Sequence, residues 1–286
     1  MLALRVVSTL VGVPATLALI RLGGYGFSVA LGAVLVVAVL EFYAVAAART
    51  GNPRGAIAPA LSRLPHPLAA LLAQGASAYL GAAWVALLVA GAHAGGGWWP
   101  GALAVSALAG WIWAVLRGQV QGALEGWLRL LGGVLYVGWL GSHLVLLRKM
   151  DGDGDWLLMA VGATFMADTA AYLVGRAVGR RPLAPAISPA KTVEGALGGF
   201  VAAWAGVLVL NYATGLRLEA GLAVPLGLLV AAAAPLGDLA ESLLKRSAGV
   251  KDTGFLVPGH GGFLDRLDSI LFVAVVVYYY ALWAVG

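Results

Sequence analysis

Cysteine is absent from the 286 residues of this chain, which excludes disulfides and thiol chemistry. Charge is scarce as well, since 11% of the residues are charged, against about 25% in ordinary soluble domains. The chain is 61% hydrophobic, has a mean hydropathy of +0.91 and contains no long polar linker. This composition indicates one compact membrane domain.

Several common functional motifs are missing too. The chain has neither the GxxxxGKS/T phosphate loop nor the HExxH zinc motif, and it lacks the DGxxAR core of CDP-alcohol phosphotransferases. The acidic stretch DGDGDW at 151–156 resembles a calcium loop. However, Trp156 and Gly162 stand where an EF-hand needs a glycine and an acid. We therefore expect a solvated acidic loop there.

Long apolar runs dominate the rest of the sequence. A hydrocarbon core about 30 Å thick needs about 20 apolar residues to cross as a helix. Nine segments approach or exceed that length: 5–21, 25–48, 68–93, 97–116, 127–147, 156–179, 194–214, 221–243 and 267–285. The sequence thus predicts an all-α, polytopic integral membrane protein with about nine transmembrane helices. We expect the first run to be a span rather than a cleaved signal, because no small-residue cleavage site follows it.

Basic residues indicate which way the spans run. With nine spans, the N-terminus and the loops after spans 2, 4, 6 and 8 share one side, which takes all but four of the 18 Lys and Arg residues. The exceptions are Arg21, Arg148, Lys149 and Arg217. By the positive-inside rule this side is cytoplasmic, and the net charge of +5 reflects basic loops rather than nucleic-acid binding.

Charged residues gather near the last two spans. In PLGDLAESLLKR, residues 235–246, Asp238, Glu241 and Lys245 share one face of a helix. Two acids on one stripe of a membrane helix can hold a divalent cation, and the lysine can meet a phosphate. An internal ion pair at a polar helix end would give the same spacing. Acids at bilayer depth cost roughly 2.5–3.5 kcal/mol and mark functional sites by default.

The stretch GHGGFLDRLD, residues 259–268, is rich in glycine and acid. Its glycines expose backbone N–H groups and allow a ligand to approach closely. Asp265 and Asp268 lie where the last span is predicted to begin, and Asp268 is the better candidate to cap that helix. His260 fits a ligand, an acid–base group or a structural donor equally well.

Span 6 contains a further acid, Asp168, on one helical stripe with Tyr172 and Arg176. Because Asp168 lies within the apolar run, we expect it to face the protein interior. The following loop, RRPLAPAISPAKTVEG at 180–195, combines cations and hydroxyls around a proline-stiffened turn. Such groups suit phosphate, although an ordinary positive-inside loop would look similar.

The cytoplasmic ends of spans 6, 8 and 9 therefore offer carboxylates and cations together. Carboxylates that bind Mg²⁺, with Lys and Arg around phosphates, are the parts of phosphoryl or nucleotidyl transfer. In such sites the protein supplies mostly position and electrostatics.

Residues 242–268, SLLKRSAGVKDTGFLVPGHGGFLDRLD, closely resemble the motif of phosphatidate cytidylyltransferases, also called CDP-diacylglycerol synthases. That motif runs S-x-x-K-R, four residues, K-D, then P-G-H-G-G and D-R-x-D; Val257 and Thr253 are conservative departures. DTAAYLVGRAVGRRPLAPAISPAKTVEGALGG at 168–199 and PLGDLAES at 235–242 look like two more blocks of the family. RLGGYGF at 21–27 and EFY at 41–43 also fit, so the resemblance spans the chain but is specific mainly in 168–268.

The resemblance implies a nucleotidyltransferase of phospholipid synthesis that makes CDP-diacylglycerol and pyrophosphate from CTP and phosphatidic acid. It implies Mg²⁺, with room for a second cation, and attack of the lipid phosphate on the α-phosphorus of CTP. Catalytic roles fall on Asp238, Asp265, Lys245 and Asp268, and metal-binding roles on Asp238, Asp265, Glu241 and Asp168. Substrate-binding roles fall on Ser188, Lys191, Thr192, Glu194, Arg246, Lys251, His260, Gly261, Gly262 and Arg266.

The resemblance also implies a location and an assembly. We expect a protein of the bacterial inner membrane with its active site on the cytoplasmic face, and a homodimer. Residues 1–286 would form one transmembrane domain, with scaffold and lipid-facing spans in 1–160 and the catalytic spans in 161–286.

Two other kinds of function compete with this interpretation. One is a related CTP-using membrane enzyme, either a polyprenol kinase or an archaeal-type lipid cytidylyltransferase; full agreement at GHGG and DRxD argues against the kinase. The other is an ion-coupled transporter with Asp168, Asp238 and Glu241 along a cation path. A transporter would place such acids near mid-membrane, whereas most of these lie at one face beside cations.

Overall fold

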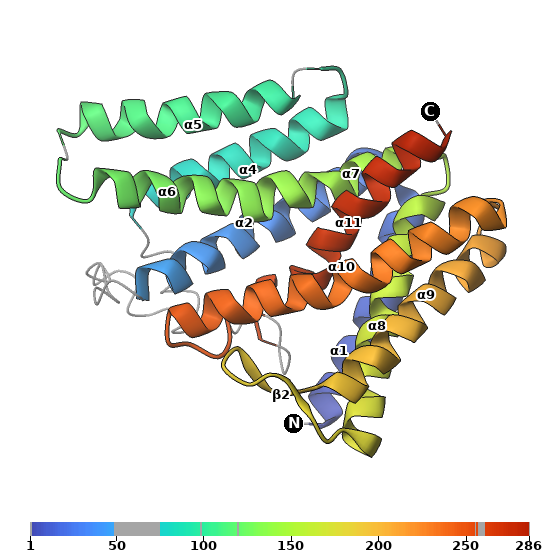
Figure 1. The fold of residues 1–286 in the computed structure, drawn as a ribbon. Helices are drawn as coiled ribbons and strands as arrows, with labels where there is room; N and C mark the ends of the chain where they lie inside the picture. The colour runs from blue at the N-terminus through green and yellow to red at the C-terminus, as the bar shows by residue number, and fades with distance from the viewer. Residues whose placement is uncertain are drawn as a thin grey trace. The chain divides into compact units, whose positions relative to one another are not determined.

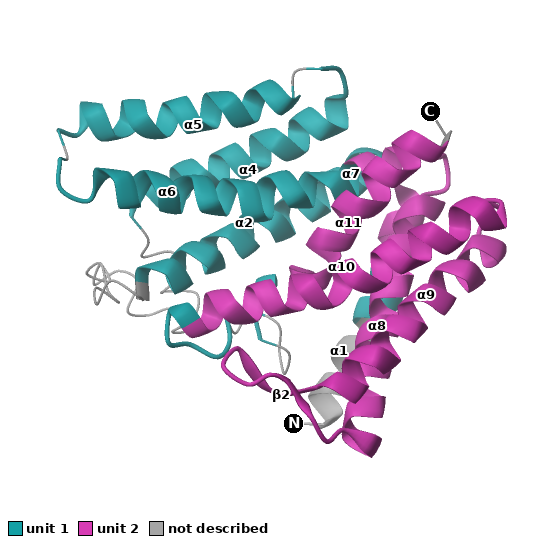
Figure 2. Cartoon of the chain, viewed as in Figure 1, with its two compact units in different colours: residues 1–16, 24–145, 247–265 teal, residues 17–23, 146–246, 266–286 magenta. Residues whose placement is uncertain are grey.

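The computed structural model describes residues 2–48, 75–97, 99–118, 120–254, 256 and 261–285. Contacts divide the chain into two compact units that interleave along the sequence (Figure 2). Unit 1 comprises residues 1–16, 24–145 and 247–265, and unit 2 comprises residues 17–23, 146–246 and 266–286. The single transmembrane domain with a functional division at residue 160 stays a prediction.

Unit 1 is built from apolar helices that pack against one another (Figure 1). They are α2 (Gly24–Ala48), α4 (Ala76–Ala94), α5 (Trp99–Leu116) and α6 (Ala123–Gly133). Glycines let these helices approach closely, as is common for helices in lipid. Gly81 of α4 and Gly133 of α6 both lie against the ring of Tyr43 on α2, which holds the three helices together.

One long helix contains a short π-helical segment. It runs without a break through α6, η2 (Val134–Trp139) and α7 (Leu140–Met150). Aromatic residues pack along it: Trp127 stacks on Trp111 of α5, with ring centroids 5.2 Å apart, and Trp139 stacks on Trp99 at 4.1 Å. The prediction of a span at 127–147 is confirmed, and the helix extends beyond both predicted ends.

Unit 2 contains α8 (Asp155–Val178), α9 (Val193–Ala213), most of α10 (Ala220–Ser247) and most of α11 (Leu264–Val285). Helix α1 (Leu2–Leu22) contributes its last residues. Helices α8 and α9 lie side by side (Figure 1). A Cβ on Gly199 would lie 2.9 Å from the carbonyl oxygen of Ala167, so this glycine allows the two backbones to touch.

A short antiparallel hairpin joins α8 to α9, formed by β1 (Pro182–Ala184) and β2 (Ser188–Thr192). The hairpin passes directly into α9, because Thr192 is the N-cap of that helix and its Oγ1 accepts from the N–H of Gly195 at 3.1 Å. The sequence predicted only a proline-stiffened loop here, so the strand pairing is a finding of the structure.

The predicted spans are largely confirmed. Among the described residues, eight helices are long and apolar enough to cross a membrane, and a shorter apolar helix covers Gly12–Leu22. The predicted bounds were approximate: α11 begins at Leu264, against a predicted start near 267, and α10 continues to Ser247, against a predicted end near 243. The first residues of the predicted span 68–93 lie outside the described residues. The protein is an α-helical integral membrane protein, and the part of it that the structure describes includes a small β-hairpin.

The acidic stretch at 151–156 is more ordered than a solvated loop. Asp151 accepts hydrogen bonds from the N–H groups of Gly154, Asp155 and Trp156 at the start of α8. Asp155 is buried and accepts from Arg21 at 2.9 Å and from the N–H of Gly215 at 2.7 Å. The expectation of a solvated loop was therefore wrong for these two acids.

Candidate active site

Three aspartates of unit 2 form a group that we call the aspartate trio: Asp168 of α8, Asp238 of α10 and Asp268 of α11. Their charges act on one another, so the three carboxylates are near neighbours. Gly237 makes this possible, because a Cβ there would lie 2.6 Å from the carbonyl oxygen of Asp268. The backbones of α10 and α11 therefore touch one residue before Asp238.

Two cations accompany the trio. Lys191 Nζ, at the end of the hairpin, lies 2.6 Å from Asp238 Oδ2. The charge of Arg266 acts on both Asp168 and Asp268, and partly offsets the repulsion among the carboxylates. Several carboxylates that repel one another, with cations beside them, are typical of a functional site. A stabilising ion pair would instead match each acid with one cation.

The trio is open rather than packed. Asp168 and Arg266 are exposed, while Asp238, Asp268 and Lys191 are half-buried. The prediction that Asp168 faces the interior was therefore wrong about its burial. The prediction that Asp168 belongs to a group of charged residues is supported, because the charges of Asp238, Lys191 and Arg266 act on it.

The hairpin residues have clear local roles. Glu194 accepts hydrogen bonds from the N–H groups of Arg180 at 3.0 Å and Arg181 at 3.2 Å, which fixes the entry to the hairpin. Arg246 of α10 donates from Nε to the carbonyl oxygen of Ile187 at 3.1 Å and so holds the hairpin tip. These contacts fix the conformation of the β1–β2 hairpin. Substrate binding stays a prediction for five residues of this region: Ser188, Lys191, Thr192, Glu194 and Arg246.

Glu241 and Lys245 form the internal ion pair that their spacing allowed. Lys245 Nζ lies 2.6 Å from Glu241 Oε2, and the Glu241 side chain is 0% exposed. A buried carboxylate without a cation would be strongly unfavourable, so each charge makes the burial of the other tolerable. The ion pair gives both residues a structural role. Metal binding by Glu241 and catalysis by Lys245 stay predictions.

Asp265 is held inside unit 1 by a dense set of hydrogen bonds. Its Oδ2 accepts from the N–H of Thr253 at 3.1 Å, from Thr253 Oγ1 at 2.9 Å and from the N–H of Gly262 at 2.8 Å. Gly261 has φ +86 and lies against the same oxygen, a backbone conformation that favours glycine. The carboxylate is thus fixed in one orientation at the start of α11.

Neither acid of this helix is its N-cap. The helix begins at Leu264, so Asp265 and Asp268 both lie within its first turns, and Asp268 Oδ1 accepts from the N–H of Ser269 at 2.7 Å. The capping role considered for Asp268 was therefore wrong.

Glu41 of α2 contacts the segment that carries Asp265, and the sequence analysis did not assign it to the site. It is 2% exposed, and its Oε2 accepts a hydrogen bond at 2.9 Å from the N–H of Leu264, the first residue of α11. Its partner is 223 residues away, so no local spacing could reveal the contact. The available signal was a lone acid within an otherwise apolar span.

The remaining predicted site residues are less informative. Lys251 is exposed, and Gly261 is half-buried whereas Gly262 is buried. His260 lies outside the described residues, so its three candidate roles stay open.

The donor chemistry of the trio suits magnesium. Among the residues that the structure describes, no three His, Asp or Glu side chains are arranged to hold a metal by themselves. Mg²⁺ is usually bound by only one or two carboxylates, together with waters and substrate phosphates. Asp238 and Asp268 are neighbouring carboxylates, which meets that requirement. Each has one oxygen that already contacts a protein donor, Lys191 Nζ and the Ser269 N–H respectively, so the other oxygen of each is the one offered to a cation.

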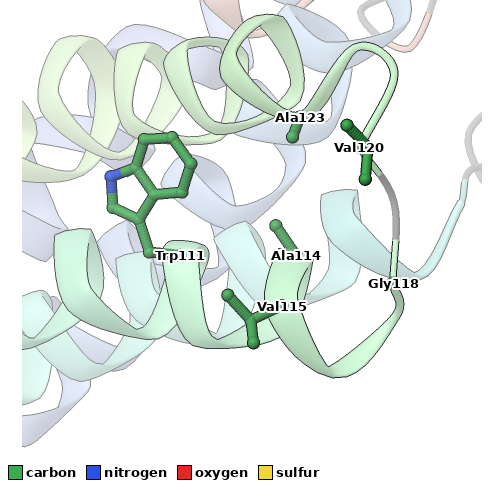
Figure 3. A pocket seen from close by; sticks show the side chains of 6 residues that line it. All are labelled: Trp111, Ala114, Val115, Gly118, Val120 and Ala123. Atoms are coloured by element: carbon green, nitrogen blue, oxygen red, sulfur yellow. The ribbon is translucent and has the colours of Figure 1, made fainter.

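An apolar hollow of about 230 Å³ lies elsewhere in unit 1, between the end of α5 and the start of α6 (Figure 3). Trp111, Ala114, Val115, Gly118, Val120 and Ala123 line it, and none of them carries a charge. It therefore offers nothing that could bind a phosphate.

Comparison with known proteins agrees with the chemistry of the site. Residues 3–283 match the model of the Cytidylyltransferase family. A Synechocystis protein named phosphatidate cytidylyltransferase is 33% identical over an alignment 304 positions long, which covers 96% of this chain and 95% of that one. A Brucella suis protein of the same name is 37% identical over 61% of this chain and 73% of its own length.

A Bacillus subtilis phosphatidate cytidylyltransferase is 42% identical over 152 residues, and there the alignment spans about half of each protein: 51% of this chain and 54% of the relative. The match to the family model covers nearly the whole chain. The chain therefore belongs to the Cytidylyltransferase family and is a nucleotidyltransferase enzyme.

Proposed function

We propose that this protein is a CTP:phosphatidate cytidylyltransferase, which makes CDP-diacylglycerol and pyrophosphate for phospholipid synthesis. The observation that carries the proposal is the aspartate trio with Lys191 and Arg266 beside it, in a membrane protein of this family. Carboxylates and cations at one open place suit a reaction between two phosphate-bearing substrates.

The chemistry is an exchange at the α-phosphorus of CTP. An oxygen of the lipid phosphate forms a new bond to that phosphorus, and the bond to the pyrophosphate oxygen breaks. The nucleophile is already an anion, so no strong general base is required. The main obstacle is the repulsion between two polyanions, which the protein overcomes by position and by charge.

Each group of residues has a part in this proposal. Lys191 and Arg266 bind phosphate oxygens beside the trio, and Arg246 and Lys251 contribute positive charge for the phosphates of CTP. Mg²⁺ held by Asp238 with Asp268 or Asp168 would neutralise phosphate charge and align the reacting groups. Asp265, fixed by Thr253 and Gly262, presents its carboxylate in one orientation.

The lipid substrate determines where the site must lie. Phosphatidate keeps its phosphate at headgroup level, and its acyl chains stay in the bilayer. The basic residues of the hairpin and of the α10 end follow the positive-inside pattern, which favours the cytoplasmic face of a bacterial inner membrane. A homodimer is part of the proposal only through the family resemblance.

The test is label transfer by purified protein supplied with Mg²⁺, phosphatidate and CTP labelled at the α-phosphorus. We expect label in the organic phase as CDP-diacylglycerol, and unlabelled pyrophosphate in the aqueous phase. If label reaches only an archaeal-type ether lipid phosphate, the acceptor is wrong. In a parallel assay with a polyprenol and CTP labelled at the γ-phosphorus, label in the polyprenol together with unlabelled lipid in the first assay would show that the reaction is wrong.

A further inference from the structure

Glu41 is the only charged residue among the 25 residues of α2, a helix that is mostly apolar. A buried carboxylate in a membrane helix is unfavourable unless it is used. Its Oε2 accepts from the N–H of Leu264, which is one of the amides that a helix start leaves without an intrahelical partner. Glu41 thus caps α11 from a distant part of the chain, within unit 1.

Two glycines lie directly against the same carboxylate. A Cβ on Gly254 would collide with Glu41 Oε1, and a Cβ on Gly262 would lie 2.5 Å from Oε2. Neither glycine has a positive φ, in contrast to Gly261. Their backbone conformation therefore tolerates alanine, and the close approach of Glu41 is what requires glycine.

The segments that touch Glu41 are also those that hold Asp265. Gly262 donates its N–H to Asp265 Oδ2, and Thr253, next to Gly254, donates twice to the same oxygen. The carboxylate of Glu41 therefore lies against the same two segments whose N–H and hydroxyl groups orient the carboxylate of Asp265.

The helix that carries Glu41 is itself anchored. Tyr43, two residues further on, donates from its hydroxyl to the buried carbonyl oxygen of Leu130 at 2.9 Å. Gly81 and Gly133 pack against the ring of Tyr43. Glu41 therefore lies on a helix that is held firmly in place, which a residue needs in order to orient another.

We propose that Glu41 is a positioning residue for cytidylyl transfer. It holds residues 253–254 and 262–264 in place and thereby fixes the carboxylate of Asp265. This inference rests on the proposed function, because it takes Asp265 to belong to the active site.

The first experiment compares Glu41→Ala, Glu41→Gln and the control Ser28→Ala in the label-transfer assay, with kcat normalised to folded protein. Ser28 is also a buried polar residue of α2, but it bonds to His93. Loss of a supporting residue typically lowers activity about 10–100-fold, and we expect Glu41→Ala to lower kcat by that factor with a smaller change in KM for CTP. Glu41→Gln keeps an acceptor for Leu264 and should stay within about threefold of wild type, as should Ser28→Ala.

The second experiment is a double-mutant cycle with Gly254→Ala. In the wild-type background the added methyl group meets Glu41, so kcat should fall about tenfold or more, whereas in Glu41→Ala the same change should cost less than about twofold. Equal effects in the two backgrounds, or a kcat for Glu41→Ala within threefold of wild type, would overturn the inference. If Glu41→Ala is not recovered folded, normal turnover by Gly254→Ala alone would overturn it. Absence of label with the wild-type protein would instead reject the proposed function on which the inference rests.

Discussion

The start and the middle of α8 use acidic residues in opposite ways. At the start, Asp151 accepts from three backbone N–H groups, and Asp155 accepts from Arg21 and from the N–H of Gly215. In the middle of the helix, Asp168 lies near two more acids, Asp238 and Asp268. At the start each carboxylate has its own hydrogen-bond donors, whereas in the middle several carboxylates lie together.

The difference indicates that Asp151 and Asp155 stabilise the fold, whereas Asp168 belongs to the candidate site. Acids that accept hydrogen bonds from a helix start stabilise that start. Acids that repel one another cost stability, and such clusters are characteristic of sites that bind cations or phosphates. The Glu241–Lys245 pair of α10 is intermediate, because its acid is paired but also lies one turn from Asp238. The following variants test where each group belongs.

The largest effect should come from Lys245→Met. This change leaves Glu241 buried without its cation, which typically costs about 3–5 kcal/mol. We expect a steep loss of thermal stability in detergent. The matched control is the double variant Glu241→Leu/Lys245→Met, which should regain most of the stability. If the single variant is as stable as wild type, the pair is not the buried contact described here; if the double variant is stable but inactive, the pair also serves the reaction.

Asp238→Asn should affect activity rather than stability. Removing one group that stabilises charge at a reacting centre typically costs about 10²–10³-fold in turnover. Because the substitution also removes a like charge from the trio, the melting temperature should stay equal or rise. Label transfer and thermal unfolding of the same preparation check both statements. Near-normal turnover would exclude Asp238 from the site.

Asp155→Ala should show the reverse pattern. The change removes the acceptor of Arg21 and of the Gly215 N–H at a buried position, which typically costs about 1–3 kcal/mol. Turnover per folded molecule should be unchanged. A tenfold loss of turnover with normal stability would contradict the division between the start and the middle of α8.

Lys149→Ala should have the smallest effect. Lys149 is an exposed residue at the end of α7, on the predicted outer side. Substitutions at exposed positions usually change stability by no more than about 0.5 kcal/mol, and label transfer should stay within a few-fold. A large loss of activity would mean that the predicted topology is wrong.

Much of this architecture could be predicted because it depends on local sequence. Apolar runs gave the spans, and the 0, 3 and 7 spacing of Asp238, Glu241 and Lys245 correctly placed them on one helical face. The apolar run after the charged stretch DRLD indicated a last span from about 267, and α11 begins slightly earlier, at Leu264. In the structure these charges form the first turns of the helix, whose first amide is satisfied by Glu41.

Contacts between distant segments could not be predicted from spacing. Glu41 meets Leu264 across 223 positions, and Asp155 meets Gly215 across 60. The burial of Glu241 and the exposure of Asp168 also depend on how helices pack. The roles of the individual site residues in metal and substrate binding stay predictions.

The most direct test of the central claim is a side-by-side assay of wild type, Asp268→Asn and Asp155→Ala with phosphatidate, Mg²⁺ and CTP labelled at the α-phosphorus. If the aspartate trio is the site of transfer, wild type and Asp155→Ala will both label the lipid, and Asp268→Asn will fall by about 10²-fold or more while staying folded. Labelling by Asp268→Asn within threefold of wild type would contradict the account.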